Sequence, residues 1–434
     1  MDAPTAVAVL FGAFFVLLFT GVPISVSLGV ASFATALAFL PWDDSTYIIG
    51  QQMNVGIESF SLLAVPLFIF AGNVMNTGGI ARRLVDLALV MVGRVPGALA
   101  HTNVLANMLF GALSGSAVAS AAAIGSTLHD RQQKAGYDPA FGAAVNIASA
   151  PTGLLIPPTT AAIVYSTVAG GVSVSALFMA GYVPGILMGL VIMVIAFAFT
   201  RRQKYPKVDR VTAAEAFQSL LRAIPGLLLI VVVIGGIVFG VFTATEGAAV
   251  AVLYTLVLSV AYRSMSWTAF KDVVNRTVVA TGIVMFLIAA SAGMSWVMAY
   301  TGIPAAITEA LLSVADSSAV ILVLMLILLL VVGTFMDITP AILIFTPILL
   351  PIAEELGMDP VQFGMVLILA MCIGTMTPPV GSVLFVGTGV SGVSIERVVP
   401  KLVPYFVGLV LLLIAVTFIP ALSLGLPGMM GLLD

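Results

Sequence analysis

The sequence is poor in charge, cysteine and histidine. Only 8% of its 434 residues are Asp, Glu, Lys or Arg, whereas 61% are hydrophobic; soluble domains carry about 25% charged residues. The single cysteine, Cys372, excludes a disulfide framework, and two histidines leave too few ligands for a zinc site. Sixteen basic residues cannot neutralise a run of nucleic-acid phosphates. These scarcities exclude soluble enzymes and nucleic-acid binders and predict a membrane protein with many crossings.

Long apolar runs predict ten membrane crossings, because about 20 apolar residues span a bilayer. They are approximately Ala6–Thr20, Ile24–Leu40, Leu62–Asn76, Phe141–Ser166, Leu177–Thr200, Ile224–Phe239, Gly247–Tyr262, Val278–Tyr300, Phe363–Gly387 and Val403–Leu422. Two further stretches, near Asn103–His129 and Val320–Ile352, are interrupted by polar residues, Gly or Pro. This pattern favours hairpins that enter and leave on the same side. No basic residue precedes the first run, so we expect a retained helix rather than a signal peptide.

The distribution of positive charge supports the two hairpins. With them in place, all sixteen Lys and Arg residues fall on one face, which the positive-inside rule makes cytoplasmic. The opposite loops carry only acidic residues: Asp43, Asp44, Glu58, Glu309, Asp316, Glu354, Glu355 and Asp359. Both termini are then expected on the periplasmic side.

A repeat of about 221 residues divides the chain into halves at 1–222 and 223–434. Gly136–Pro139 matches Gly357–Pro360, Pro157-Pro158 matches Pro378-Pro379, and Thr77-Gly78 is similar to Thr301-Gly302. Each half has five crossings, so the second is inverted, and inverted repeats with interrupted helices are typical of secondary transporters. The predicted fold is an all-α polytopic inverted-repeat transporter. Its hairpins lie at about 98–131 and 320–352, and its broken helices at about 141–166 and 363–387.

Four interruptions of the apolar segments carry the candidate chemistry: Gly111–Ser116, Pro151–Thr160, Gly333–Pro340 and Gly374–Ser382. Glycine lets the backbone turn, and proline frees a carbonyl one turn back. Ser and Thr at the start of the next helix segment lie beside unpaired N–H groups that favour an anion, and freed carbonyls suit a small cation. The combination is typical of a sodium-coupled carrier of organic anions. The alternative is that the breaks only kink helices for packing.

Asp337 is the one acidic residue expected deep in the membrane, where an ionisable group is functional by default. Three roles are open to it: cation ligand, acceptor of hydrogen bonds from the turn, or proton carrier. Asn146 and Thr152 are candidates to complete a first cation site, with hydrogen bonding between helices as the alternative. Glu246, in Thr243-Ala-Thr-Glu246, is expected to cap a helix near the outer interface.

Amphipathic stretches outside the crossings predict bracing helices. Ala81–Val95 and Trp267–Val278 carry basic residues and are expected to lie on the inner surface, with Asp43–Phe60 as an outer counterpart. Such arms would brace a mobile hairpin-bearing core against a rigid frame.

The motifs resemble the large membrane subunit of tripartite ATP-independent periplasmic (TRAP) transporters. The similar segments are Leu113–Ser120, Ile156–Ala161, Gly333–Pro340, Gly374–Gly381 and the short turn Thr243–Glu246. The resemblance covers nearly the whole chain and implies a non-enzymatic bacterial inner-membrane symporter, driven by sodium and moving like an elevator. Implied partners are a small four-helix membrane subunit, a periplasmic binding protein and membrane lipids, with no nucleic acid. Family substrates are mostly carboxylates, including C4-dicarboxylates and sialic acid, and sodium ions couple transport without another cofactor.

The resemblance, taken with the four interruptions, also predicts site residues. Substrate is expected near Ser114, Ser116, Pro157, Thr159, Thr160, Thr339, Pro340, Pro378 and Val380. Sodium is expected near Ser114, Asn146, Thr152, Gly153, Gly333, Asp337, Gly374 and Thr377.

Three other functions compete with this interpretation. A self-sufficient sodium–dicarboxylate symporter would need no binding protein, and the sequence leaves that alternative open. An intramembrane aspartyl protease needs two membrane aspartates, and only Asp337 is deep. An ion channel would show a ring of like charges along a pore, and no such pattern is present.

Overall fold

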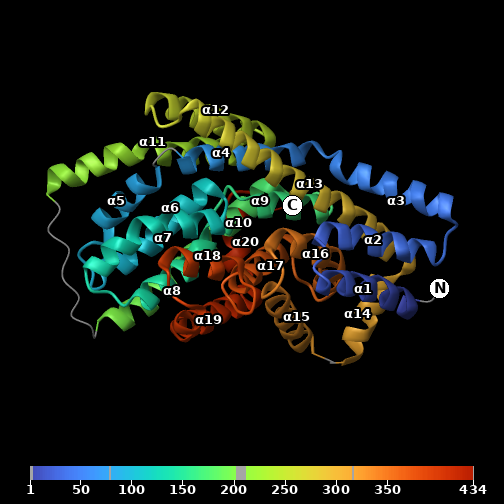
Figure 1. The fold of residues 1–434 in the computed structure, drawn as a ribbon. Coiled ribbons are helices and arrows are strands. Elements are labelled where there is room, and N and C mark those ends of the chain that lie inside the picture. Colours follow the sequence, from blue (N-terminus) through green and yellow to red (C-terminus); the bar gives the residue numbers. More distant parts are fainter. Residues whose placement is uncertain (1–2, 78–79, 202–211, 315–316, 434) are drawn as a thin grey trace.

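The computed structural model describes residues 3–77, 80–201, 212–314 and 317–433. Within these ranges the chain is helical, with no strand assigned, which confirms the all-α prediction (Figure 1). Several sequence features lie outside the described residues: Gly78, Arg202, Lys204, Lys207, Arg210 and Asp316.

The first half of the chain consists of short frame helices followed by a hairpin, a broken helix and a long helix. The frame elements are α1 (Ala3–Phe19), α2 (Ile24–Leu37), α3 (Trp42–Ile57), the 3₁₀ turn η1 (Phe60–Leu63), α4 (Ala64–Thr77) and α5 (Ile80–Val92). Hairpin 1 is α6 (Ala98–Ser114) and α7 (Ala117–Lys134). The first broken helix is α8 (Pro139–Ser149), the 3₁₀ turn η2 (Ala150–Leu154) and α9 (Thr160–Val168), and α10 (Val174–Thr200) follows.

The second half repeats this order. Its frame elements are α11 (Ala213–Val238), α12 (Ala244–Ala261), α13 (Trp267–Thr301) and α14 (Ile303–Val314). Hairpin 2 is α15 (Ser318–Gly333) and α16 (Ile338–Glu355), the second broken helix is α17 (Pro360–Gly374) and α18 (Ser382–Ser391), and α19 (Ile395–Phe418) and α20 (Ala421–Met429) end the chain. Both matched double prolines, Pro157-Pro158 and Pro378-Pro379, have cis peptide bonds. The inverted orientation of the two halves stays a prediction.

Local residue chemistry explains the two hairpin turns. α6 ends at Gly115, whose φ of 60° is a left-handed conformation that glycine adopts without steric cost. Ser116 then caps α7 by accepting a hydrogen bond from the N–H of Ala119 at 3.2 Å. In hairpin 2, Asp337 caps α16 by accepting from the N–H of Ile338 at 3.0 Å. The predicted hairpins and broken helices are therefore present.

Two expectations about helix bounds are wrong. The predicted surface helix Trp267–Val278 and the crossing after it form one continuous helix, α13, because Ser266 caps the start and no proline interrupts the run. The last predicted crossing began at Val403, but α19 begins at Ile395 and carries Pro400 and Pro404 inside it. Helix α19 ends at Phe418, two residues before Pro420, instead of reaching Leu422.

Seven helices of the described residues are long and apolar enough to cross a membrane, against ten predicted crossings. The broken helices are each divided into shorter pieces, and α1 and α2 have 17 and 14 residues. One of the seven, α16, is the second arm of hairpin 2, and 72% of its apolar window is buried, against 33–44% in the other six. Helix α16 is therefore an interior element, and the number of crossings stays a prediction.

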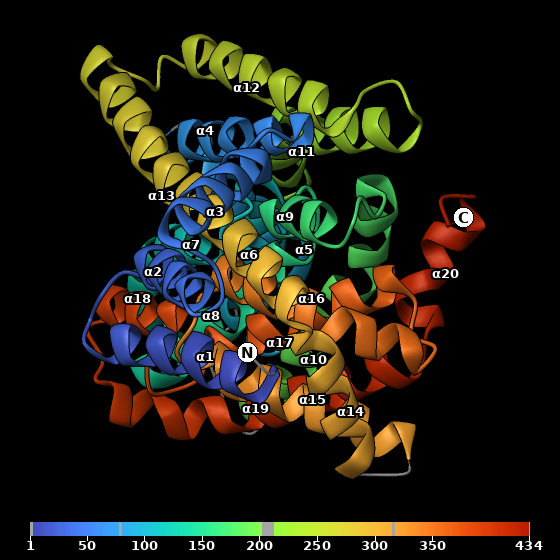
Figure 2. The same cartoon turned by 90° about the vertical axis from the view of Figure 1, so that its right-hand side faces the viewer.

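Most frame helices pack on one another, but α5 packs on hairpin 1. Helix α13 packs along α2, α3 and α4, and α12 packs on α4. Apart from α5, the main neighbours of the hairpins are the broken helices. Figure 2 shows α11 and α12 on one side of the molecule and α15 and α19 on the other, with α13 running across between them. The predicted arms at Asp43–Phe60 and Ala81–Val95 are helices, α3 and α5, and α5 packs on α6, α7 and α11.

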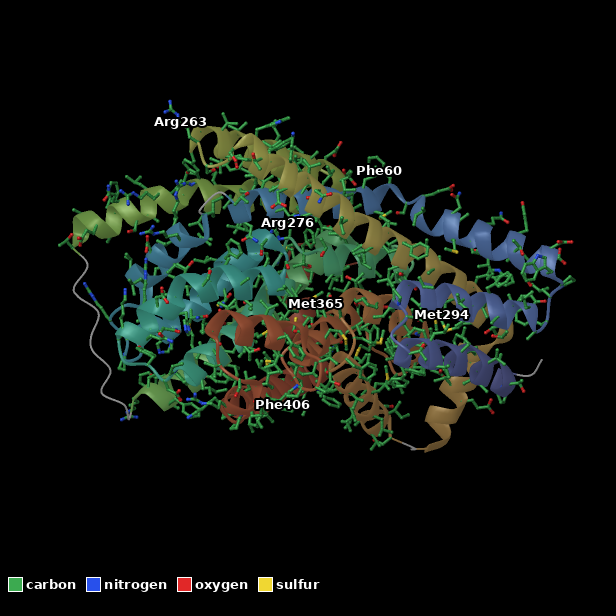
Figure 3. The ribbon with its side chains drawn as sticks, in the orientation of Figure 1. Phe60, Arg263, Arg276, Met294, Met365 and Phe406 are labelled. Atoms are coloured by element: carbon green, nitrogen blue, oxygen red, sulfur yellow. The ribbon has the colours of Figure 1, made fainter. Side chains whose placement is uncertain are left out.

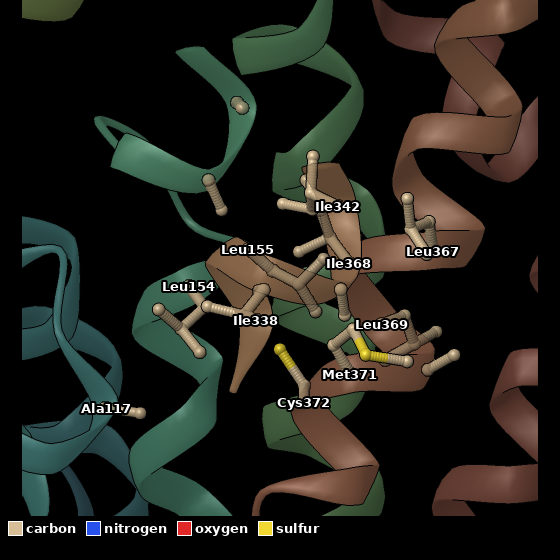
Figure 4. Close-up of a cluster of buried hydrophobic side chains, with 14 of the residues drawn as sticks. Ala117, Leu154, Leu155, Ile338, Ile342, Leu367, Ile368, Leu369, Met371 and Cys372 are labelled. Carbon is tan, nitrogen blue, oxygen red and sulfur yellow. The ribbon is translucent and has the colours of Figure 1, made fainter. Parts of the chain in front are cut away.

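An apolar core lies where the two broken helices meet. Leu154 and Leu155 of the first break face Ile338 and Ile342 of α16 and Cys372 of α17 (Figure 4). The Cys372 thiol donates to the carbonyl oxygen of Pro151, 221 residues earlier in the chain, at 3.4 Å. Equivalent positions of the two repeats thus touch each other, which brings the four interruptions together.

Candidate transport site

The four interruptions line a single cavity of about 420 Å³, here called the central cavity. Both hairpin tips, both broken helices, α4 and α13 contribute to its wall. The predicted site residues that line it are Ser114, Ser116, Thr160, Asp337 and Thr339. Residues from opposite ends of the sequence therefore converge, which supports the functional interpretation of the breaks over simple kinks.

Four helices begin at the central cavity. The first residues of α7, α9, α16 and α18, which are Ala117, Thr160, Ile338 and Ser382, all line it. The first turn of a helix leaves N–H groups without intrahelical partners, and the helix dipole adds partial positive charge there. Side-chain caps at Ser116, Thr159 and Asp337 satisfy one N–H each. The arrangement suits a small anion that accepts several hydrogen bonds.

Asp337 is accessible from the central cavity and carries the negative charge of the hairpin 2 tip. Its carboxylate accepts the hydrogen bond from Ile338, so one of its three possible roles, acceptor in the turn, is present. Across the described residues no basic side chain is ion-paired with it. One carboxylate oxygen is therefore available for a cation or a proton.

At two glycine pairs, the backbone of a broken helix packs directly on the backbone of a hairpin tip. A Cβ added to Gly153 would lie 2.3 Å from the Cα of Gly111, and one added to Gly374 would lie 2.4 Å from the Cα of Gly333. The pairs are related by the sequence repeat and join each hairpin tip to its own broken helix. The backbones of hairpin tip and broken helix therefore approach too closely for a side chain to lie between them.

The predicted cation ligands Asn146 and Thr152 lie behind the cavity wall in hydrogen-bonded contacts. The Asn146 side chain accepts from Asn107 at 3.1 Å and donates to the carbonyl of Ala121 at 2.8 Å. The Thr152 hydroxyl donates to the carbonyl of Ser149 at 2.7 Å. Hydrogen bonding between helices, the alternative role for Asn146, is therefore present, and cation binding by either residue stays a prediction.

The remaining predicted residues flank the cavity without lining it. Pro157 and Thr159 are buried in the first break, and Pro340 is buried in α16. In the second break, Pro378 and Val380 are exposed, and the Val380 N–H donates to the carbonyl of Thr334 at 3.1 Å. The Thr377 hydroxyl donates to the carbonyl of Ile373 at 2.7 Å.

The sequence analysis missed several residues of the cavity wall. Asn73 and Arg276 line the central cavity together with Ser382, whose buried hydroxyl has no hydrogen-bond partner among the described residues. Asn73 donates to the Thr277 hydroxyl at 3.0 Å and so joins α4 to α13. The sequence placed Arg276 in a surface helix at Trp267–Val278. The charge pattern did not show that this segment is the first part of the long helix α13, which packs beside the hairpin tips.

Glu246 occupies the predicted capping position. Its carboxylate accepts from the N–H of Thr243 at 2.8 Å, while the Thr243 hydroxyl accepts from the N–H of Glu246 at 3.2 Å. This reciprocal pair is a capping box that fixes the start of α12.

Helical hairpins and broken helices that meet at one cavity define a multi-pass membrane transport protein. Residues 11–422 match the family described as tripartite ATP-independent periplasmic transporter, DctM component. The chain belongs to this family, as the resemblance of its motifs predicted.

Curated relatives span nearly the same length. The uncharacterized protein YgiK of Salmonella typhimurium is 50% identical and covers 97% of both chains. The C4-dicarboxylate TRAP transporter large permease protein DctM of Pseudomonas aeruginosa is 40% identical, covering 94% of this chain and 95% of that protein. The 2,3-diketo-L-gulonate TRAP transporter large permease protein YiaN of Escherichia coli is 38% identical, covering 93% and 95%.

A solved structure shares the fold. The YdaH transporter of Alcanivorax borkumensis superposes with a TM-score of 0.64, covering 86% of this chain and 88% of that one. At 15% sequence identity, this likeness concerns the fold alone.

Proposed function

We propose that this chain is the large permease subunit of a sodium-driven TRAP importer of an organic acid anion in the bacterial inner membrane. A periplasmic binding protein delivers the anion, a small four-helix subunit completes the permease, and both termini of the large subunit are periplasmic. The observation that carries the proposal is the convergence of four helix N-termini on the central cavity.

The substrate class is a small carboxylate. The N-termini of α7 and α16 approach the cavity from hairpins of opposite halves, so each can donate backbone N–H groups to a carboxylate. Ser116 and Thr339 add hydroxyls on the two sides. Relatives named for C4-dicarboxylate and 2,3-diketo-L-gulonate transport support an organic acid as cargo.

Sodium binds, in this proposal, to backbone carbonyls beside the two glycine pairs. Each pair, Gly111 with Gly153 and Gly333 with Gly374, joins a hairpin tip to a broken helix. Asp337 supplies a negative charge on the second side. Cation binding would hold each hairpin tip against its broken helix and so complete the anion site, which couples the two ligands.

Movement of the core against the frame provides access to the two membrane faces. The hairpins and broken helices pack mainly among themselves, while α13 packs on α2, α3 and α4. The two groups meet most extensively where α5 packs on hairpin 1, and also where α4 packs on α6 and α9 and where α13 and α14 pack on α16. A core of this kind can slide as a unit along the frame and carry the site with it, as in an elevator.

Reconstitution tests the proposal. The large subunit is placed in liposomes with its cognate small subunit. Organic acids that stabilise the cognate binding protein in a thermal-shift screen are offered as labelled substrates. We expect uptake that requires both the binding protein and an inward sodium gradient. Equal uptake with potassium in place of sodium would contradict sodium coupling. Uptake by the large subunit without the binding protein would instead support the self-sufficient symporter.

A further inference from the structure

Arg276 lies at the junction of two cavities. It lines the central cavity and also an adjacent cavity of about 430 Å³, whose wall includes Arg82, Ser126 and Asp272. Asn73 is likewise shared by both cavities. Figure 3 shows Arg276 over the hairpin helices, whereas Arg263 lies at the periphery. The walls of the two cavities therefore meet at Asn73 and Arg276, and Arg276 lies at the junction.

Arg276 is held in place by a weak and replaceable partner. Its Nη2 lies 2.7 Å from Oδ2 of Asp272, one helical turn earlier on α13. The side chains are 70% and 50% exposed, and exposed ion pairs stabilise a fold very little. A second carboxylate that enters the cavity can therefore take the place of Asp272 at small cost.

The charges around the two cavities favour an anion at this point. Arg276 and Asp337 are the charged side chains that line the central cavity within the described residues, and Asp337 belongs to the opposite, hairpin 2 side. In the adjacent cavity Arg82 adds a second positive charge, and the acidic side chain in the lining is Asp272, the ion-pair partner of Arg276. A guanidinium presents a planar fork of N–H donors that matches a carboxylate in bidentate geometry.

We propose that Arg276 binds a carboxylate of the transported anion at the junction of the two cavities, in exchange for Asp272. The inference rests on the proposed function, since it takes the cargo to be an organic anion. Helix α13 belongs to the frame, whereas the hairpin tips that hold the anion belong to the core. The contact between Arg276 and the anion therefore forms only when the core lies beside Arg276. By binding one carboxylate, Arg276 favours transfer of the anion from the helix N-termini to the adjacent cavity.

Ligand binding to the complete permease tests this role, with succinate in sodium buffer as the probe. The readouts are the succinate dependence of the thermal unfolding midpoint and the KM of sodium-driven succinate uptake. R276Q is expected to raise the half-saturating succinate concentration by about tenfold or more, as loss of a charge-assisted hydrogen bond predicts. R276K is expected to recover part of the affinity, and D272N to bind at least as tightly as wild type.

Two control variants separate binding from folding. K271Q removes a positive charge from the same helix, at a residue that lines neither cavity, and is expected to behave as wild type. D272N/R276Q removes the ion pair without leaving an unpaired carboxylate and is expected to bind as weakly as R276Q. Wild-type affinity in this double variant, or a change of less than about twofold in R276Q, would overturn the role of Arg276 while leaving the proposed function intact. A wild-type permease with neither a succinate-dependent shift nor succinate uptake would overturn the binding of a C4-dicarboxylate at Arg276, whereas the proposed function, which names only an organic acid anion, is decided by the reconstitution.

Discussion

The contact between Gly333 and Gly374 makes the second break sensitive to a single methyl group. In a Gly374→Ala variant the new Cβ would lie 2.4 Å from the Cα and carbonyl carbon of Gly333 and 2.6 Å from its oxygen. Ordinary contacts begin at 3.4 Å, so α15 and α17 must separate by about 1 Å (3.4 − 2.4). All three atoms belong to the backbone, so no side-chain rotation can relieve the overlap.

The expected consequence is a loss of transport together with a loss of stability. Forcing a methyl group into a packed contact costs about 1–3 kcal/mol. A displacement of this size also moves the carbonyls that we assign to a sodium ion, and oxygen ligands of small cations tolerate little variation in distance. Sodium-driven uptake in proteoliposomes is expected to fall by about tenfold or more, as a loss of about 1.4 kcal/mol in binding would produce.

A matched substitution controls for the change from glycine to alanine itself. A Cβ on Gly389, in α18, would meet no atom within 4 Å, so Gly389→Ala is expected to keep wild-type uptake. In the other half, Gly153→Ala places its Cβ 2.3 Å from the Cα of Gly111 and is expected to behave like Gly374→Ala. Wild-type uptake and an unchanged melting temperature in Gly374→Ala would refute the reasoning.

Three further substitutions have expected outcomes. Asp337→Asn keeps a side chain that can cap α16, so membrane insertion should be normal while sodium-coupled uptake is lost; wild-type uptake would remove Asp337 from the mechanism. Asn107→Ala removes a buried side chain that bonds Asn103, Asn146 and Ser120, and thermal melting should show a loss of about 1–3 kcal/mol. An unchanged melting temperature would show that the network is not structural. Tyr165→Phe removes the 2.6 Å hydrogen bond to the carbonyl of Pro360, with an expected loss of about 1 kcal/mol and unchanged substrate preference; a changed preference would indicate a role in the site.

Hairpins, broken helices and caps could be predicted because their causes are local. Gly115 permits the turn after α6, and Ser116 and Asp337 cap the helices that follow, so the sequence motif and the structure coincide. Thr243 and Glu246 form the capping box that their spacing predicts. The continuity of α13 was harder to predict. The polar stretch Trp267–Val278 is typical of a surface helix, but it contains no proline that would end the helix before the apolar run.

The sequence by itself determined the class of the protein: a scarcity of charge, a repeat of about 221 residues, and four interruptions that mark the site. Only the tertiary structure decided which of the marked residues share a cavity. It placed Ser114, Ser116, Thr160, Asp337 and Thr339 around one cavity and left Asn146 outside its lining, in a hydrogen-bonded network. It also brought Arg276 to the junction of two cavities. The physical reason is that turns and caps depend on neighbouring residues, whereas a cavity wall depends on packing between helices far apart in the chain.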